Sequence, residues 1–340
     1  MWTTRILTGF LTAITGAAAT AMPLAAGGED PPGLAVTGDV SPVHDPAIVR
    51  VGDSYILFST GQAADATGIV PIRVSTDLKH WVLRGALFPR MPAWATETIK
   101  GTRGVWAPDI SYRGGEYRLY YSVSTFGKNQ SAIGLTTTPS LDPQAPASGW
   151  TDRGMVFGSS FRDDFNAIDP NVFDDAEGRQ WLAFGSFWTG IKMIRLDPKT
   201  GMRSSEDMKV YALASRRNPG AIEAPYVIRR GGYYYLFASF DFCCRGARSS
   251  YYTVVGRAKL PTGPYLDRDG KKMLDGGGFI VLHADLDPSK RFAGPGHPAI
   301  LQGKGRDYIV YHAYDTQADG RPTLRIQMLG WTEDGWPVAI

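Results

Sequence analysis

The stretch Ile168-Asp169-Pro170-Asn171-Val172 joins an acidic residue to a proline and then to apolar residues that favour a β-strand. Four other stretches share this form, a polar or small residue beside a proline that apolar residues follow. They are His44-Asp45-Pro46-Ala47-Ile48, Trp106-Ala107-Pro108-Asp109-Ile110, Glu223-Ala224-Pro225-Tyr226-Val227 and Gly296-His297-Pro298-Ala299-Ile300. Recurrence of one unit along a chain indicates a repeat architecture.

Each of these stretches is followed by a turn rich in Gly or Asp and then by an aromatic, β-rich run, which is the chemistry of a hairpin. These second runs cover residues 54–59, 117–122, 180–185, 233–239 and 308–314. Third runs cover residues 72–75, 132–135, 191–196, 253–258 and 324–330, and fourth strands are expected at 82–88, 155–158, 210–214 and 279–282. The pattern predicts an all-β fold, a five-bladed β-propeller. The alternative is a β-sandwich with coincidental hairpins.

The composition agrees with an all-β enzyme and argues against nucleic-acid binding. The 340 residues include 40 Gly and 23 Pro, which suggests many turns, and 12% are aromatic. The formal net charge is only +3, and no basic run is interleaved with aromatic residues as a nucleic-acid surface requires.

The N-terminus has the pattern of an export signal. Arg5 precedes an apolar stretch over residues 6–19, and alanine-rich cleavage candidates follow at residues 19–26. The stretch is short for a membrane span. We therefore expect a signal peptide at 1–26, a catalytic domain at 34–340, a secreted protein and no stable membrane association after cleavage. An uncleaved anchor is the alternative.

The repeat also predicts where the functional residues meet. In a propeller, equivalent strands of all blades surround one central channel. If the strands that contain the prolines are innermost, Asp45, Asp169, Glu223 and His297 converge at one end of that channel. Burying three acids together is costly unless they are used or paired.

Three converging carboxyl groups suit glycoside hydrolysis. That reaction needs one ionised carboxylate and one protonated carboxylic acid, and a third carboxylate can raise the pKa of the acid. Nearby aromatic rings could stack on sugars, although packing between blades would explain them equally well. The candidates are Trp106, Phe126, Phe187 and Trp188.

The only two cysteines, Cys243 and Cys244, are adjacent. Their Cα atoms would lie about 3.8 Å apart, below the usual range for a disulfide. A strained disulfide between neighbours and two buried thiols therefore both remain open.

With these residues in place, the chain resembles the arabinanases of glycoside hydrolase family 43 over roughly residues 42–338. The matching stretches are Pro42-Val43-His44-Asp45-Pro46, Trp106-Ala107-Pro108-Asp109-Ile110, residues 120–127, Asn166-Ala167-Ile168-Asp169-Pro170, residues 183–192, Ile222-Glu223-Ala224-Pro225, residues 239–244, Gly294-Pro295-Gly296-His297 and Tyr311-His312-Ala313-Tyr314-Asp315.

The resemblance implies hydrolysis of α-1,5-linked L-arabinan, or of arabino-oligosaccharides from pectin, with inversion. Asp45 would be the general base, Glu223 the general acid and Asp169 the residue that tunes the acid. Sugar would lie along Asp45, Trp106, Phe126, Gly127, Asn166, Ala167, Ile168, Asp169, Ser186, Phe187 and Trp188. His297 would sit beside a calcium ion bound largely through water. From the residues alone, a hydrogen-bonded core residue is the favoured interpretation of His297, because calcium prefers oxygen ligands.

Several alternatives remain open at this point. Endo action is the first expectation, and an exo-acting arabinanase, a β-xylosidase or an arabinofuranosidase could use the same fold. A retaining enzyme acting on fructans and a non-catalytic sugar-binding propeller are more distant alternatives.

We also expect a monomer. The glycosylation sequon at Asn129-Gln130-Ser131 is expected to be unused, because a glycan there would obstruct the cleft.

Overall fold

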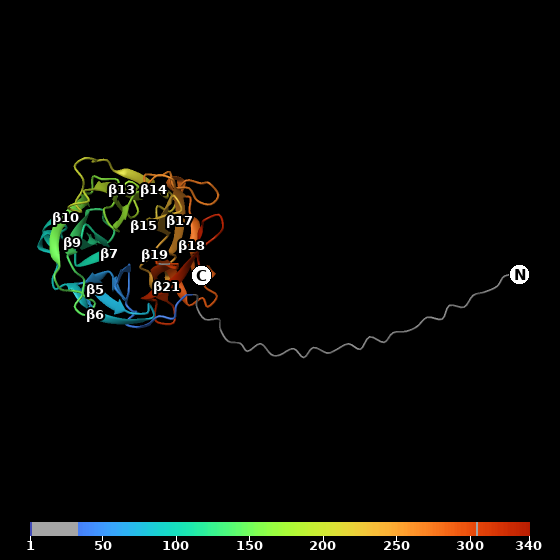
Figure 1. Ribbon diagram of the computed structural model, residues 1–340, viewed down its shortest axis with the longest axis horizontal. Coiled ribbons are helices and arrows are strands. Elements are labelled where there is room, and N and C mark those ends of the chain that lie inside the picture. The colour runs from blue at the N-terminus through green and yellow to red at the C-terminus, as the bar shows by residue number, and fades with distance from the viewer. Residues whose placement is uncertain (2–32, 304) are drawn as a thin grey trace.

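The computed structural model describes residue 1 and residues 33–340 except residue 304. Apart from Met1, the predicted signal peptide lies outside the described residues. No helix in the described part of the chain is long and apolar enough to cross a membrane. The described residues form five sheets, arranged as the blades of a propeller around one centre (Figure 1). The predicted five-bladed fold is confirmed.

Each blade is built from consecutive strands of the chain, except that blade 2 also includes one short strand from within the stretch that forms blade 1. Blade 1 contains β2 (Ala47–Val51), β3 (Ser54–Phe58), β5 (Ile69–Ser75) and β6 (His80–Phe88), with β1 (Thr37–Gly38) paired to β6. Blade 2 contains β7 (Gly104–Arg113), β8 (Glu116–Val123), β9 (Ser131–Thr138) and β10 (Thr151–Ser159), with β4 (Gly61–Gln62) paired to β7. Blade 3 contains β11 (Asn171–Asp174), β12 (Gln180–Phe184), β13 (Ile191–Leu196) and β14 (Tyr211–Ala214).

Blade 4 contains β15 (Ile222–Arg230), β16 (Tyr233–Phe240), β17 (Tyr252–Ala258) and β18 (Phe279–Leu282). Blade 5 contains β19 (Phe292–Leu301), β20 (Asp307–Asp315), β21 (Arg321–Trp331) and β22 (Pro337–Ala339). The helices are α1 (Ala93–Thr98), η1 (Gly246–Arg248), η2 (Met273–Asp275) and η3 (Ala284–Leu286). In Figure 1 the proline-containing strands β7, β15 and β19 lie toward the centre, whereas β6 and β10 lie at the rim.

The short elements, among them α1 and β22, were not predicted from the sequence. α1 is only 6 residues long and has no side-chain cap, so it carries little periodic signal. β22 is only 3 residues long, and it completes blade 5 by pairing with β21. The structure contains the expected turn between β15 and β16. Gly231 and Gly232 in this turn have φ of 56° and 76°, a conformation that favours glycine in tight hairpins.

The residue before each repeated proline has an unusual backbone. All five of these residues have positive φ, between 44° and 58°. They are Asp45, Ala107, Asp169, Ala224 and His297. Positive φ is uncommon for residues other than glycine, and such strain tends to gather at functional sites. The strand pairing shifts register at this point in β7, β15 and β19.

Each of these strained residues is held by the preceding blade of the ring. The backbone N–H of Ala107 donates to Thr60 Oγ1 (2.8 Å), and those of Asp169 and His297 donate to Ser122 Oγ and Ser239 Oγ (2.9 Å each). Asp45 donates to Nδ1 of His312 in blade 5 (3.1 Å). The side-chain acceptors thus fix the orientation of the peptides that line the centre.

The hydrophobic core is divided among the interfaces between blades. One cluster of buried side chains fills each of the five interfaces. The cluster between blades 5 and 1 packs Leu57 and Trp81 against Val310 and Leu324. Burial of apolar surface between successive blades, rather than within one blade, therefore stabilises the ring.

The segment that precedes blade 1 closes the ring. Leu34 and Val43 donate backbone hydrogen bonds to the carbonyls of Ile326 (2.8 Å) and Pro322 (3.0 Å), and Leu324 donates to the carbonyl of Val40 (2.9 Å). Residues 34–43 thus bind the β21 strand of blade 5 before the chain enters blade 1.

Candidate active site

Asp45 is a buried carboxylate held by several donors. Its Oδ1 lies 2.9 Å from His44 Nδ1 and 3.0 Å from His297 Nδ1, and its Oδ2 accepts a 2.6 Å hydrogen bond from Thr60. Burial alone would raise the pKa of Asp45, but the two histidines outweigh it and bring the pKa well below its usual value. Asp45 is therefore ionised at neutral pH.

Glu223 has the opposite electrostatic character. Burial is the main cause of a raised pKa at this carboxyl group, and the charge of Asp45 adds to it. Ser186 Oγ donates to Glu223 Oε2 at 2.7 Å, and the two residues also form a β-bridge. The environment favours a protonated Glu223 that is fixed in direction by Ser186.

Asp169 contacts the peptide next to Glu223. Its Oδ2 accepts the backbone N–H of Ala224, the residue after Glu223, at 3.1 Å. Burial and the charge of Glu223 raise the pKa of Asp169 to about 8, although His297 opposes them. The predicted convergence of Asp45, Asp169 and Glu223 is therefore present.

Two histidines near Asp45 have pKa values that are shifted in opposite directions. Burial lowers the pKa of His297, but Asp45 opposes this and the pKa is raised to about 9. Burial lowers the pKa of His312 well below its usual value, so His312 is neutral. Its Nε2 is buried with no hydrogen-bond partner among the described residues. The site therefore contains a cation, His297, beside the ionised Asp45.

The surroundings of His297 fit a calcium ion only through water. Two clusters of metal-ligating groups are found among the described residues: His44 with Asp45 and His312, and His44 with Cys243 and Cys244. Neither includes His297, and His297 would have to lose its proton before one imidazole nitrogen could bind an ion, whose other ligands would be water. The expected calcium ion stays a prediction.

The remaining residues that were predicted to contact sugar differ in their burial and in their contacts. Asn166, Ala167 and Ile168 are buried just before Asp169, and Asn166 Oδ1 has no hydrogen-bond partner among the described residues. Its capacity to accept a hydrogen bond is therefore unused among the described residues. Phe187 and Trp188 both have positive φ, 55° and 42°.

Phe187 is tied to blade 4 because its N–H donates to the carbonyl of Ile222 at 2.8 Å. Trp188 is 42% exposed, as a ring that stacks on a sugar must be. Trp106 is half-buried in β7, next to Ala107. Phe126 is 83% exposed and precedes Gly127 in a turn, and the structure shows no contact between this turn and the three acids.

The sequon residue Asn129 is unsuited to glycosylation as folded. Its side chain is 7% exposed, and its amide nitrogen donates to the carbonyls of Ser160, Asp163 and Phe165 at 3.0, 2.8 and 3.2 Å. This agrees with the expectation that the sequon is unused.

The structure adds partners that the sequence analysis did not assign. His44, Thr60 and His312 contact Asp45, and Tyr314 contacts His44. His44 directly precedes Asp45, and two of the others lie in the stretch Tyr311-His312-Ala313-Tyr314-Asp315, so a sequence signal existed. Cys243 and Cys244 form a disulfide, which resolves the alternative left open above.

The fold and this site define a class of protein. A buried centre that lowers the pKa of one carboxyl group and raises the pKa of another has the arrangement that glycoside hydrolysis requires. Comparison with known proteins gives the family. Residues 40–337 match the family model described as "Glycosyl hydrolases family 43", and the chain belongs to this family of glycosidases.

Characterised relatives extend over nearly all of the chain. An extracellular endo-α-(1→5)-L-arabinanase of Bacillus subtilis is 42% identical over 297 residues, covering 87% of each chain. An extracellular exo-α-(1→5)-L-arabinofuranosidase of Cellvibrio japonicus is 41% identical over 307 residues, covering 87% of this chain and 85% of the relative. The structure of a Cellvibrio cellulosa α-L-arabinanase complexed with arabinohexaose has a TM-score of 0.81 and 39% identity, covering 88% of this chain and 96% of that one.

Proposed function

We propose that this glycosidase cleaves α-1,5-L-arabinofuranosidic bonds within arabinan and inverts the configuration at the anomeric carbon. The observation that carries the proposal is the opposite environment of two buried carboxyl groups: Asp45 lies between two histidines and has a lowered pKa, whereas Glu223 contacts Ser186 and has a raised pKa. The substrate rests on the relatives, because both the endo-acting and the exo-acting relative are named for α-1,5-linked arabinose.

The proposed mechanism has a single displacement step. Ionised Asp45 removes a proton from a water molecule, which attacks the anomeric carbon, while Glu223 gives its proton to the leaving oxygen. Ser186 orients Glu223. Asp169 holds the adjoining peptide and tunes the pKa of the acid. The first product carries the inverted hydroxyl, so NMR of fresh hydrolysate distinguishes this mechanism from retention.

Endo action is the first candidate and exo action the second, which the 41% identical Cellvibrio relative specifically supports. A time course of products from linear arabinan separates them. A ladder of oligosaccharide sizes at early times supports endo cleavage. A single short product from the start supports exo cleavage. Release of sugar only from aryl xylosides or aryl arabinofuranosides would reject both in favour of a trimming enzyme.

Three further properties are part of the proposal. The protein is exported, in line with the two relatives described as extracellular, and N-terminal sequencing of protein from the medium should begin near residue 27. It acts as a monomer, which light scattering can check.

A calcium ion bound through water at His297 supports the site, and metal analysis by mass spectrometry should find about one ion per chain. Purified protein without a bound divalent ion would reject the calcium site.

A further inference from the structure

Three consecutive hydrogen-bonded contacts connect the disulfide to the proposed base. The backbone N–H of Cys244 donates to Tyr314 Oη at 2.7 Å, Tyr314 Oη lies 2.8 Å from His44 Nε2, and His44 Nδ1 lies 2.9 Å from Asp45 Oδ1. We propose that the Cys243–Cys244 disulfide and Tyr314 are positioning elements that act on Asp45 through His44. This inference rests on the function proposed for Asp45.

The disulfide keeps the first donor of this chain in place. A bond between neighbouring side chains closes a small ring around the peptide that joins them, which restricts the rotation of that peptide. Cys244 has a φ of 66°, in a region that residues other than glycine seldom occupy. Backbone hydrogen bonds from Asp241 to Ala221 (3.2 Å) and from Ser250 to Phe242 (3.0 Å) hold the two ends of the loop. The loop therefore presents the Cys244 N–H in one direction.

Tyr314 connects the Cys244 N–H to the imidazole of His44. Because the Tyr314 oxygen accepts the N–H of Cys244, its own O–H is available to donate to His44 Nε2. His44 then carries its proton on Nδ1 and donates it to Asp45 Oδ1. The His44 ring also stacks on His312, with centroids 3.8 Å apart. Both the ring plane and the tautomer of His44 are thereby fixed.

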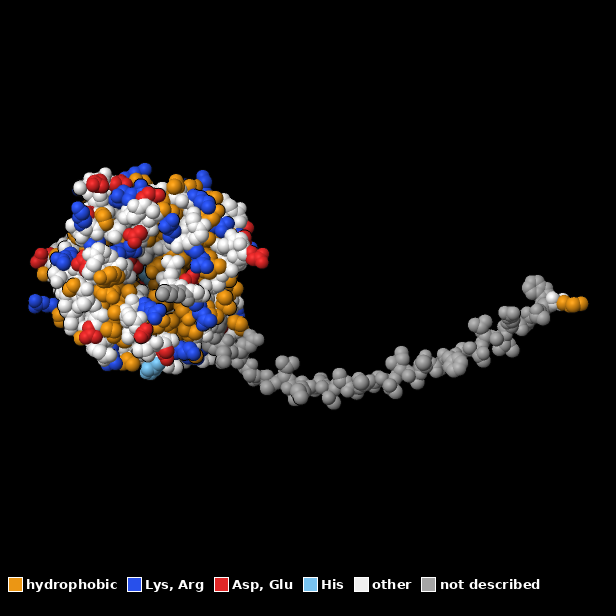
Figure 2. All heavy atoms as spheres, viewed as in Figure 1, with side chains coloured by type: hydrophobic (Ala, Val, Ile, Leu, Met, Phe, Trp, Pro, Cys, Tyr) orange, Lys and Arg blue, Asp and Glu red, His pale blue; other side chains and the backbone are white. Residues whose placement is uncertain are grey.

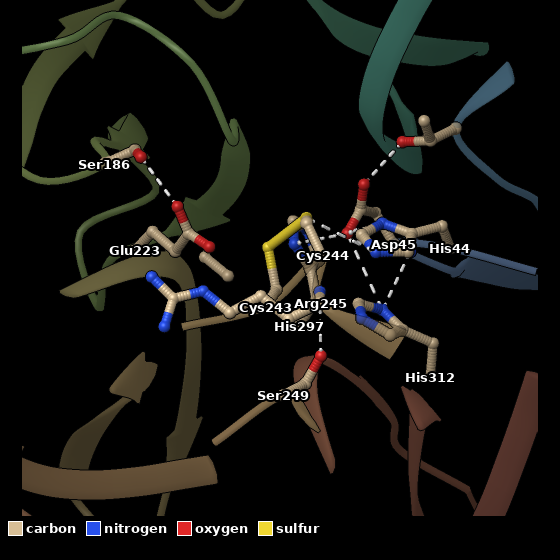
Figure 3. Close-up of a disulfide and its surroundings, with 12 residues drawn as sticks. His44, Asp45, Ser186, Glu223, Cys243, Cys244, Arg245, Ser249, His297 and His312 are labelled. Carbon is tan, nitrogen blue, oxygen red and sulfur yellow. Dashed lines mark hydrogen bonds and ion pairs between the residues drawn. A yellow bond between two sulfur atoms is a disulfide. The ribbon is translucent and has the colours of Figure 1, made fainter. Parts of the chain in front are cut away.

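The arrangement joins three parts of the ring. His44 and Asp45 precede β2 of blade 1, Tyr314 is in β20 of blade 5, and Cys244 is in the loop after β16 of blade 4. In Figure 3 the disulfide occupies the middle of the view, with Glu223 on one side and Asp45 and His44 on the other. Cys244 is exposed, and its Sγ lies 3.9 Å from His44 Nε2. A small reductant can therefore reach the bond while the protein stays folded.

Reduction of the native protein tests the proposal without a mutation. The protein is treated with a phosphine reductant, and alkylation followed by mass spectrometry measures the fraction of free thiols. We expect kcat on linear arabinan to fall roughly tenfold, less than the hundredfold that a 1 Å displacement can cause, with KM nearly unchanged. Reoxidation should restore kcat. Fully reduced protein with an unchanged kcat would overturn the inference.

A pair of tyrosine variants separates positioning from general stability. Tyr314→Phe removes the link, so it should lower kcat by a similar factor and make the enzyme insensitive to the reductant. Tyr311→Phe is the matched control: it lies in the same strand, and its hydroxyl donates to Gln327 at 2.8 Å instead. The control should keep full activity and the full response to reduction.

The effects of Tyr314→Phe and of disulfide reduction on kcat must also be non-additive. If Tyr314→Phe still loses the same factor on reduction, the disulfide does not act through Tyr314 and the proposal is wrong. Circular dichroism at the assay temperature confirms that each form is folded. Asp45→Asn distinguishes this failure from failure of the function itself. An active Asp45→Asn rejects the proposed base, whereas an inactive Asp45→Asn with no effect of Tyr314→Phe or of reduction rejects only the link.

Discussion

The Oδ2 atom of Asp169 accepts the backbone N–H of Ala224 at 3.1 Å, and this bond ties the proposed tuning residue to the peptide next to the acid Glu223. In blades 2 and 4, Ser122 and Ser239 hold the equivalent peptide of the next blade through a hydroxyl. Blade 3 has Gly185 at the corresponding place after β12. Gly185 has no hydroxyl, and the carboxylate of Asp169 takes over the role of acceptor.

The first prediction concerns Asp169→Asn and the alkaline limb of the pH–rate profile. The rate falls with rising pH as Glu223, the proposed acid, loses its proton. A raised pKa of Glu223 therefore moves this limb to higher pH. Asp169 and Glu223 are both buried, and ionising both is opposed by their like charges. Replacing Asp169 with a neutral amide removes that repulsion, and the limb of kcat/KM should move to lower pH. An unmoved limb would exclude the tuning role.

The second prediction separates the general acid from the rest of the site. Glu223→Ala should lower kcat on arabinan by about 10²–10⁴-fold, the usual contribution of acid–base catalysis. On an aryl arabinofuranoside with a good leaving group the loss should be much smaller, because that leaving group departs without a proton. Steady-state kinetics on both substrates checks this, and equal losses on the two would contradict the assignment of Glu223 as the acid.

The third prediction concerns Thr60, which contacts two of the central residues. Its Oγ1 donates to Asp45 Oδ2 at 2.6 Å and accepts the Ala107 N–H at 2.8 Å. Thr60→Val keeps the shape but loses both bonds, so kcat should fall about tenfold through loss of orientation of Asp45. Thr60→Ser keeps the hydroxyl and should retain most activity. If the two variants behave alike, the hydroxyl has no part in the reaction.

The fourth prediction concerns stability at the interface between blades 2 and 3. Asp109 is buried and accepts from Asn171 Nδ2 (3.1 Å) and from the backbone N–H of Val172 (2.8 Å). Asp109→Ala leaves these buried donors without a partner and should lower the free energy of unfolding by about 3 kcal/mol. Asp53→Ala, at an exposed ion pair with Arg50, is the control and should change it by less than about 1 kcal/mol. Denaturant unfolding measures both.

The sequence predicted the parts of this structure that repeat. The five proline stretches established the number of blades, and the residues beside the prolines established which acids converge. The positive φ of Asp45 and its equivalents was not predictable, because it depends on acceptors such as Thr60 that lie in another blade. The link from Cys244 to His44 through Tyr314 was missed for the same reason. Its members are distant in sequence and meet only after the ring has closed.

Ring closure has a consequence for when this protein becomes active during its synthesis. Asp45 belongs to the first blade, but His297 and His312, which contact it, and Tyr314, which contacts His44, belong to the last. The segment that closes the ring, residues 34–43, also binds β21 of the last blade to be made. A nascent or truncated chain that lacks blade 5 therefore holds all three acids and yet cannot assemble the surroundings of its base. We therefore expect a chain that ends before blade 5 to show no hydrolytic activity.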